Sequence, residues 1–330
     1  DGTIVVDPKR MDRIIKIDAK NMYAVIEPYV TFAALQAEVM KAGLSYPSPP
    51  AGSQISALAN ISWHGGYGNS WISGLGAQML LAYELVLPSG EILRSGSVSP
   101  SGSDWIWNDG PGPDLRGFLR GAQFGHAGGM GMVTKVSTRL FPWTGPQVFP
   151  TEGNALEKVS EFASDTFRWY MIDFAHNYPE EEEYALKKAC DFQYELAKAE
   201  IGAVVQHLAK QFLLSWASRT KEEFHEGMAR DVFPRGYNVV GLSSTTSLEQ
   251  LEYEEKVLRH IVEQQGGTFL TAEDEPYRLW MTIANDWIRT GHSMRLSRPS
   301  DSFHQGTACL DSIDNVSKEI VRANRAQREV

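Results

Sequence analysis

The sequence predicts an α+β protein of two domains. The first third of the chain alternates short β-branched runs with turn residues, a pattern that is typical of antiparallel strands. Beyond residue 150, apolar residues recur at helical spacing over longer segments. The run Tyr237–Ser243, Leu248–Gln265 and Thr268–Leu270 has the pattern strand, helix, strand, which indicates a layer of the split-βαβ kind. A chain of 330 residues has room for two domains of this size.

Local patterns predict the elements before residue 142. Strands are expected at Thr3–Asp7, Ile14–Ile17, Tyr23–Glu27 and Met132–Leu140, with a hairpin that joins Leu80–Leu87 to Glu91–Arg94. Thr31 is placed to cap a helix that ends at Gly43, and Asp114–Arg120 has the pattern of a short helix. Residues 51–77 are rich in Gly, Ser and Asn, which predicts close backbone approach to a ligand rather than core packing.

The second half begins after a turn-rich stretch. Thr144–Thr151 holds several turn residues, so the domains are predicted to be 1–145 and 146–330. Amphipathic helices are expected at Ala155–Ser164 and Glu180–Ala199, before the strand, helix and strand already named.

Composition limits the class of protein. Apolar residues make up 42% of the chain and charged residues 22%, which allows a large core and excludes global disorder. A net charge of −10 argues against a nucleic-acid-binding surface. With only two cysteines, Cys190 and Cys309, the chain can build neither a disulfide framework nor a four-cysteine zinc site. We therefore expect no metal centre, no membrane span and a reducing, cytoplasmic location.

Two glycine-rich segments are the strongest chemical signal. Pro49–Ile55 leads into Ile61–Gly68, and Gly125–Val133 runs directly into a strand. Many backbone N–H groups in such turns can bind an anionic, planar ligand, such as a flavin dinucleotide. The alternative, that these glycines only make tight turns, stays open at this point. The chain has no P-loop motif and no G-x-S-x-G elbow.

An ordered series of motifs resembles one family. The strings "IVVDPKRMDRIIKIDAKNMYAVIEP", "LLAYELVLPSGEILRSGS" and "PDLRGFLRGAQFGHAGGMGMVTKVSTRLFP" occur in that order. They are similar to the FAD-binding domain of the vanillyl-alcohol oxidase/p-cresol methylhydroxylase superfamily, of the glycolate-oxidase-like kind. The resemblance implies that residues 1–145 are the second subdomain of a PCMH-type FAD-binding domain. Residues 146–330 would then be an α/β cap domain with an antiparallel sheet flanked by helices.

The resemblance also implies where FAD would bind. Three stretches carry over as cofactor contacts: Pro49, Pro50, Ala51, Gly52, Ser53, Gln54 and Ile55; Ser62, Trp63, His64, Gly65 and Gly66; and Ala127, Gly128, Gly129, Met130, Gly131, Met132 and Val133. The family's Glu-Gly-Thr is replaced by Ala127-Gly128-Gly129, so only backbone contacts carry over there. The family's R-G-x-G loop and its closing histidine segment do not occur, so we expect a chain that lacks the N-terminal FAD loop and the C-terminal segment.

The substrate site is less specified. Arg289 and Arg295 are candidates to bind an anionic substrate and His292 to move a proton, the alternatives being surface ion pairs and a structural histidine. Hydroxy-acid members of the family place an arginine where this chain has Ile283, and phenol-oxidising members place an acidic residue at Ser62. Covalent attachment of FAD at His64 is not favoured.

The resemblance implies an FAD-dependent oxidoreductase that transfers a hydride from a hydroxy acid, alcohol or phenol to FAD. Two alternatives remain, a non-redox alkyl transferase of the ether-lipid type and a non-catalytic subunit that has lost flavin. The implied partners are a small-molecule substrate and an electron acceptor, either oxygen or a protein. The oligomeric state, with a homo-oligomer among the options, stays open.

Overall fold

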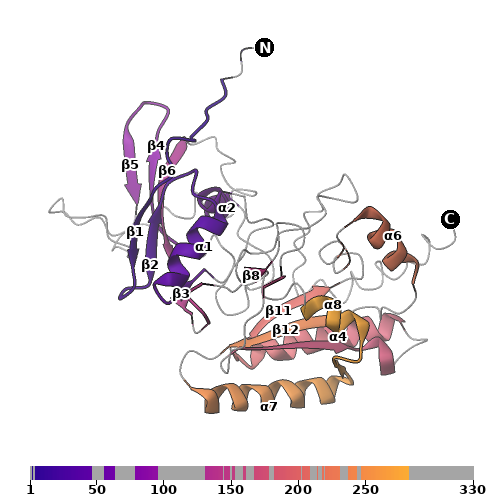
Figure 1. Cartoon of the computed structure of the whole chain (residues 1–330). Coiled ribbons are helices and arrows are strands. Elements are labelled where there is room, and N and C mark those ends of the chain that lie inside the picture. Colours follow the sequence, from indigo (N-terminus) through magenta and orange to yellow (C-terminus); the bar gives the residue numbers. More distant parts are fainter. Residues whose placement is uncertain are drawn as a thin grey trace. The chain divides into compact units, whose positions relative to one another are not determined.

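A computed structural model gives the arrangement of the chain (Figure 1). It describes residues 2, 4–46, 56–63, 79–95, 131–143, 145–148, 151–152, 159–160, 167–177, 182–201, 203–208, 214, 218, 220–230, 237–243 and 247–281. The chain divides between residues 149 and 150 into two compact units, which we describe separately. Both units combine helices with antiparallel strands, which confirms the α+β prediction.

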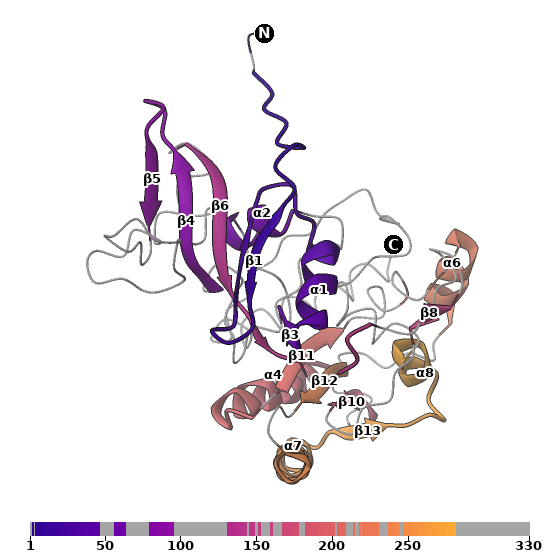
Figure 2. The ribbon, with the colours of Figure 1, turned by 60° about the vertical axis from the view of Figure 1, so that its left-hand side comes forward.

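The first unit is built on a five-stranded antiparallel sheet (Figures 1 and 2). Its strands are β1 (Ile14–Asp18), β2 (Tyr23–Ile26), β4 (Leu80–Val86), β5 (Ile92–Ser95) and β6 (Met132–Arg139). Their spatial order is β1-β2-β6-β4-β5, so β6 lies between two pairs of strands that are each close in sequence. The end of the second glycine-rich segment therefore runs into the middle of the sheet.

Two helices cover one face of this sheet (Figure 2). In α1 (Phe32–Lys41), the Thr31 hydroxyl oxygen accepts a hydrogen bond from the backbone N–H of Ala34 at 3.2 Å. Such a cap satisfies a donor that the first helical turn leaves unpaired. The helix α2 (Ala57–Trp63) packs against β6. A short pair, β3 (Leu44–Ser45) with β7 (Phe141–Pro142), joins the chain after α1 to the chain after β6.

Apolar side chains from these elements form one continuous core. It includes Ala24, Ile26, Phe32, Leu35, Val39, Tyr46, Ala57, Leu58, Ile61, Tyr83, Leu85 and Val136. The core lies between the helices and the sheet, which fixes α1 and α2 against the strands that carry the glycine-rich segments.

Two predictions for this unit are wrong. Of the strand expected at Thr3–Asp7, the described residues join no sheet, and Ile4 and Val5 are each 86% exposed. Residues 57–63, expected in an open stretch, form α2 because Ala57, Leu58 and Ile61 have helical spacing and enter the core. The helix predicted at Asp114–Arg120 lies outside the described residues.

The second unit contains a four-stranded antiparallel sheet. Its strands are β10 (Phe167–Asp173), β11 (Ala203–Leu208), β12 (Tyr237–Ser243) and β13 (Thr268–Leu270), in the order β11-β12-β10-β13. The helix α4 (Glu182–Lys198) connects β10 to β11, and α7 (Leu248–Gln265) connects β12 to β13. This is the split-βαβ arrangement that the sequence predicts.

Smaller elements complete the second unit. They are β8 (Thr151–Glu152), β9 (Val159–Ser160), the 3-10 turn η3 (Ala175–Asn177), α6 (Lys221–Ala229) and α8 (Glu275–Met281). Val159–Ser160 is a strand, so the helix predicted at Ala155–Ser164 is wrong at those two residues, and its other residues lie outside the described part. The helix predicted at Glu180–Ala199 is confirmed over 182–198.

The two faces of the β10 strand contact different helices. On one face Arg168 pairs with Glu255 of α7, and Arg259 lies over the rings of Tyr170 and Phe269. On the other face the ring of Trp169 meets that of Trp280 in α8 edge-on, with centroids 5.1 Å apart. The sheet is therefore covered by α7 on one side and by α8 on the other.

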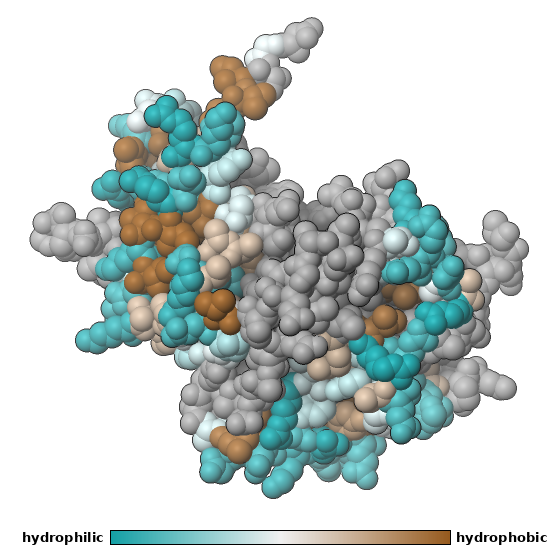
Figure 3. Space-filling model, viewed as in Figure 1, coloured by the Kyte–Doolittle hydropathy of each residue, from teal (hydrophilic) through white to brown (hydrophobic). Residues whose placement is uncertain are grey.

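The hydropathy of the surface differs between the two units (Figure 3). Hydrophobic side chains gather over the strands of the first unit, where Ile15 and Ile92 are exposed, whereas the surface along α7 is hydrophilic. Within the described residues, no helix is long and apolar enough to cross a membrane. The same residues bring no three His, Cys, Asp or Glu side chains together as a metal site.

Candidate functional site

The predicted cofactor residues fall partly within the described chain. Ser62 and Trp63 end α2, Gly131 immediately precedes β6, and Met132 and Val133 are its first residues. The remaining predicted contacts lie outside the described residues; these are 49–55, 64–66 and 127–130. Arg289, His292 and Arg295 lie outside them as well. The structure therefore shows how the three predicted stretches join the fold, and all three join the first unit.

Both ends of the first stretch are bonded to α1 and its neighbours. Before it, the backbone N–H of Tyr46 donates to the side-chain oxygen of Gln36 at 3.0 Å, and Gln36 is only 1% exposed. After it, the hydroxyl of Ser56 donates to the backbone oxygen of Pro28 at 2.5 Å. The backbone N–H of Ala57 donates to Val30 at 2.8 Å. The fold thus fixes Tyr46 and Ser56, the described residues on either side of this stretch.

The third stretch ends against the backbone of β4. Gly131 has φ +140°, a conformation that side chains strongly disfavour. A Cβ atom at this position would lie 2.2 Å from the backbone oxygen of Val86. Only glycine can therefore bring the stretch this close to the strand, and Met132 then pairs directly with Val86.

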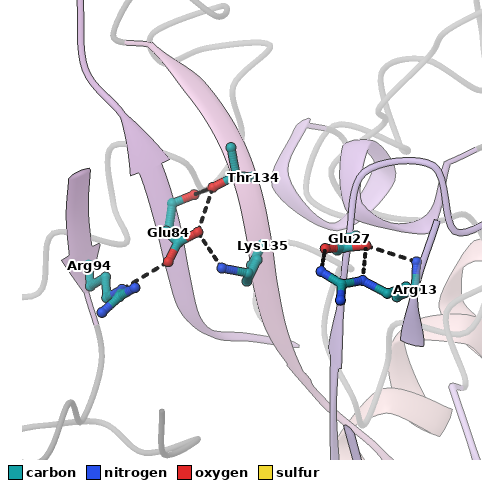
Figure 4. Close-up of polar contacts among 6 residues, drawn as sticks. All are labelled: Arg13, Glu27, Glu84, Arg94, Thr134 and Lys135. Atoms are coloured by element: carbon teal, nitrogen blue, oxygen red, sulfur yellow. Dashed lines mark hydrogen bonds and ion pairs between the residues drawn. The ribbon is translucent and has the colours of Figure 1, made fainter. Parts of the chain in front are cut away.

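A buried carboxylate lies beside this junction (Figure 4). Glu84 of β4 is 5% exposed, and its Oε1 atom accepts from the Thr134 hydroxyl at 2.9 Å and from Lys135 Nζ at 2.6 Å. Its Oε2 atom accepts from Arg94 Nε at 2.8 Å. Burial opposes ionisation, but the hydrogen bonds from Lys135, Arg94 and Thr134 outweigh it, and the pKa of Glu84 is lowered.

A second buried carboxylate has a simpler environment (Figure 4). Glu27 receives three hydrogen bonds, all from Arg13: the guanidinium donates to both carboxylate oxygens and the backbone N–H to Oε2. The hydrogen bond from the Arg13 side chain is the main reason why the pKa of Glu27 is lowered. This pair closes the start of the sheet, since the backbone N–H of Glu27 also donates to Arg13.

These residues fit a large anionic cofactor. Tyr46, Ser56, Trp63 and Gly131, which flank or end the stretches, carry no carboxylate that would repel a pyrophosphate. The glycine at 131 keeps side-chain bulk away from the last stretch. The buried Tyr46 hydroxyl has no hydrogen-bond partner among the described residues, and burial raises its pKa, so it stays a neutral phenol.

Sequence reasoning did not identify the supporting residues. Gln36 and Ser56 fix the first stretch, and Glu84 contacts the strand that follows the third. One signal was available, because Glu84 is the only charged residue within the apolar run "LLAYELV". A charge inside an apolar strand indicates a specific partner, but its identity depends on Thr134 and Lys135, fifty residues away.

The N-terminal part of the chain has known relatives. Residues 1–96 match the family described as the FAD binding domain. Over 150 residues the chain is 34% identical to the flavoprotein subunit of 4-cresol dehydrogenase (hydroxylating) from Pseudomonas putida. This match covers 43% of this chain and 26% of that protein. Over 143 residues it is 29% identical to a glycolate oxidase subunit of Bacillus subtilis, and this match covers 43% of this chain and 28% of that protein. The chain spans about a quarter of the length of these relatives.

A solved structure extends the likeness in fold beyond the first unit. The 4-ethylphenol oxidase of Gulosibacter chungangensis, in complex with isoeugenol, matches 87% of this chain and 53% of its own, with a TM-score of 0.58 and 18% identity. The family match, the sequence relatives and this shared fold confirm the resemblance on which the sequence analysis relies. Residues 1–96 thus match the FAD binding domain, and over about 150 residues the chain is similar in sequence to the flavoprotein subunit of a 4-cresol dehydrogenase and to a glycolate oxidase subunit.

Proposed function

We propose that the chain is the flavin-binding and substrate-covering part of an FAD-linked oxidoreductase that oxidises a small organic molecule. The observation that carries this proposal is the match of residues 1–96 to the FAD binding domain. Support also comes from the two sequence relatives, whose names are those of a dehydrogenase and an oxidase. Neither name is that of an alkyl transferase, so we favour the redox function over the non-redox alternative.

In this proposal the first unit holds the cofactor. Residues 49–55, 62–66 and 127–133 would bind FAD through backbone N–H groups, with Tyr46, Ser56 and Gly131 fixing the ends of the stretches. FAD, when bound, supplies the hydride acceptor. Arg289 and Arg295 would bind an anionic substrate, and His292 would hold or accept a proton from its hydroxyl group.

We propose a hydroxy acid or an alcohol or phenol as the substrate. The two relatives point to different members of this set, because one is a 4-cresol dehydrogenase and the other a glycolate oxidase subunit. The string MGMVTK at residues 130–135 is closer in sequence to the phenol-oxidising members, whereas Ser62 departs from them. The substrate class is therefore a matter for direct measurement.

We further propose that oxygen or a partner protein would serve as the electron acceptor. The Pseudomonas relative is a flavoprotein subunit, and therefore one component of a larger assembly, which supports a protein acceptor. The scarcity of cysteine supports a reducing location such as the cytoplasm.

The test is a flavin titration followed by reduction. The purified chain, supplied with FAD and then desalted, should retain the yellow flavin spectrum. D-lactate, 2-hydroxyglutarate and 4-cresol are then added separately under anaerobic conditions. One of these substrates should bleach the flavin spectrum.

Each outcome decides between the alternatives. Bleaching by a hydroxy acid or by 4-cresol supports the redox function and names the substrate class. A chain that retains flavin but is bleached by none of them contradicts the redox function and favours the alkyl transferase. A chain that stays colourless contradicts flavin binding altogether and favours a non-catalytic subunit.

A further inference from the structure

Three charged residues form one row across β6, β4 and the edge strand β5 of the first sheet (Figure 4). Glu84 of β4 lies directly opposite Arg94 of β5 and Lys135 of β6 in the strand register. Its neighbours Tyr83 and Leu85 enter the core, so the row lies on the face away from α1 and α2. Each carboxylate oxygen of Glu84 bonds one cation, which places the carboxylate as a bridge between three strands.

The row coincides with a break in the regular pairing of β4 and β6. Glu84 pairs with Lys135 but the next residue, Leu85, pairs with Val133, which leaves Thr134 as an extra residue in β6. Such a bulge bends a strand and changes the direction of its end. It also explains why Val133 and Val136, three residues apart, both contact the same core.

Glu84 holds this bulge directly. The Thr134 hydroxyl lies 2.9 Å from Oε1 and 3.3 Å from the backbone oxygen of Glu84. The extra residue of the bulge is therefore hydrogen-bonded to Glu84 on the neighbouring strand. Thr134 is buried together with the carboxylate. The bulge is therefore an ordered feature with its own hydrogen bonds.

We propose that Glu84 is a positioning residue for residues 131–133, the described end of the cofactor stretch 127–133. The inference rests on the proposed flavin function of that stretch. Two residues, Met132 and Val133, lie between the bulge at Thr134 and Gly131, so these two positions are about 10 Å apart at strand geometry. The bulge sets the direction of β6 as it leaves the sheet, and Gly131 fixes its contact with Val86. Together they determine where the backbone N–H groups of residues 131–133 lie.

Charge makes this position sensitive to Glu84. Replacing the carboxylate with an amide keeps its size and one acceptor oxygen but removes the negative charge that pairs with Lys135 on β6 and with Arg94 on β5, the strands on either side of β4. Loss of the ion pair between Glu84 and Lys135, which lie directly opposite each other, would loosen the pairing of β4 with β6 at the bulge. The effect should therefore be local to the start of β6.

The chain offers a matched control in the same sheet. Glu27 is also buried and also bonded to an arginine, and its hydrogen bonds come from Arg13, while Lys135 of β6 acts on it only through its charge. Glu84→Gln and Glu27→Gln would be compared by hydrogen exchange of the chain without added FAD. We expect Glu84→Gln to speed exchange of the amides in residues 131–135 at least about tenfold, with little change there in Glu27→Gln.

A second variant keeps the test independent of the charge. Thr134→Val preserves side-chain volume and both ion pairs but removes the hydroxyl that bonds Glu84. It should speed exchange in the same segment by a smaller factor, on the order of threefold. If neither variant speeds exchange at residues 131–135 more than Glu27→Gln does, the positioning role is wrong.

Flavin affinity provides the link to function. The dissociation constant for FAD should be about tenfold higher for Glu84→Gln than for Glu27→Gln. The two variants are compared at temperatures equally far below their unfolding midpoints, so that a difference in stability does not enter. Equal affinities in the two variants would show that the stretch is not positioned by Glu84 for binding. If the unaltered chain takes up no FAD, the proposed function fails, while hydrogen exchange still decides whether Glu84 positions the stretch.

Discussion

At the scale of single residues, the first unit depends on a position that only glycine can occupy. Gly131 combines φ +140° with a backbone neighbour 2.2 Å from where a Cβ would stand. Gly90 also has positive φ, at +87°, but open space surrounds it. The two glycines therefore separate the effect of contact from the effect of backbone conformation.

We predict that Gly131→Ala destabilises the first unit by about 3 kcal/mol, because the methyl group forces β4 and β6 apart. Gly90→Ala should cost only about 1 kcal/mol, since it meets strain alone. Urea unfolding of both variants measures the difference. Equal costs would mean that the approach of Gly131 to Val86 does not constrain the protein.

The buried carboxylates predict the pH dependence of the first unit. The pKa values of Glu27 and Glu84 lie below their ordinary value of 4.5, so both carboxylates stabilise the folded state above that pH. This stabilisation is lost as the pH falls through the lowered values. The urea midpoint should be flat near neutrality and fall below about pH 4.5.

The double variant Glu27→Gln/Glu84→Gln should start with a lower midpoint and lose less of it on acidification. A double variant with the same acid sensitivity as the unaltered chain would assign the pH dependence to other groups. Asp173 in the second unit has the opposite sign, because burial raises its pKa and acidification relieves that cost.

At the scale of elements, helix ends are defined by local chemistry. Ser247 begins α7, and its hydroxyl oxygen accepts from the backbone N–H of Gln250 at 3.0 Å. Gly266 ends the helix in the left-handed conformation, with φ +71°. These signals explain why the bounds of α7 were predicted from the sequence to the residue.

We predict that Ser247→Ala destabilises the second unit by about 1 kcal/mol, because one backbone donor of α7 loses its partner. Ser247→Asp should be nearly neutral, since a carboxylate oxygen accepts the same bond and favours the helix N-terminus. Thermal unfolding of the two variants tests this. A destabilised Asp variant would show that the hydroxyl has another role.

Elements that depend on tertiary contacts were harder to predict. The strand β10 was missed although "FRWYMID" is rich in aromatic and β-branched residues, because its partner strands are far away in sequence. The helix α2 was missed because glycines and serines surround it, and only burial of Ile61 and its neighbours shows the helical face. Conversely, the strand expected at Thr3–Asp7 had the right residue types but pairs with no described strand.

At the scale of the whole molecule, the sequence predicted the α+β class and the split-βαβ layer. The glycine-rich stretches could be identified in the sequence, because a glycine pattern is local. The residues that support those stretches could not be predicted, because a hydrogen bond such as that from Tyr46 to Gln36 depends on how a helix packs. Where each candidate substrate residue lies remains a prediction.

The division into two units predicts two unfolding transitions, since each unit has its own sheet and buried side chains. Gly131→Ala should lower the midpoint of one transition and Ser247→Ala that of the other. Calorimetry of the two variants and their combination measures both. A single transition that both variants shift equally would show that the units unfold as one.

The place of β6 in the first sheet has a kinetic consequence. The β1–β2 and β4–β5 pairs each join strands that are close in sequence, whereas β6 must bridge them after the long segment of residues 96–131. Closing a long loop is slow, so we expect the two hairpins to form early and β6 to dock in the last step. Since docking of β6 is then the rate-limiting step, Val136→Ala, in the core of β6, should slow folding, as the folding arm of a chevron plot would show. A newly made chain would then be unable to take up its cofactor until the final strand has docked.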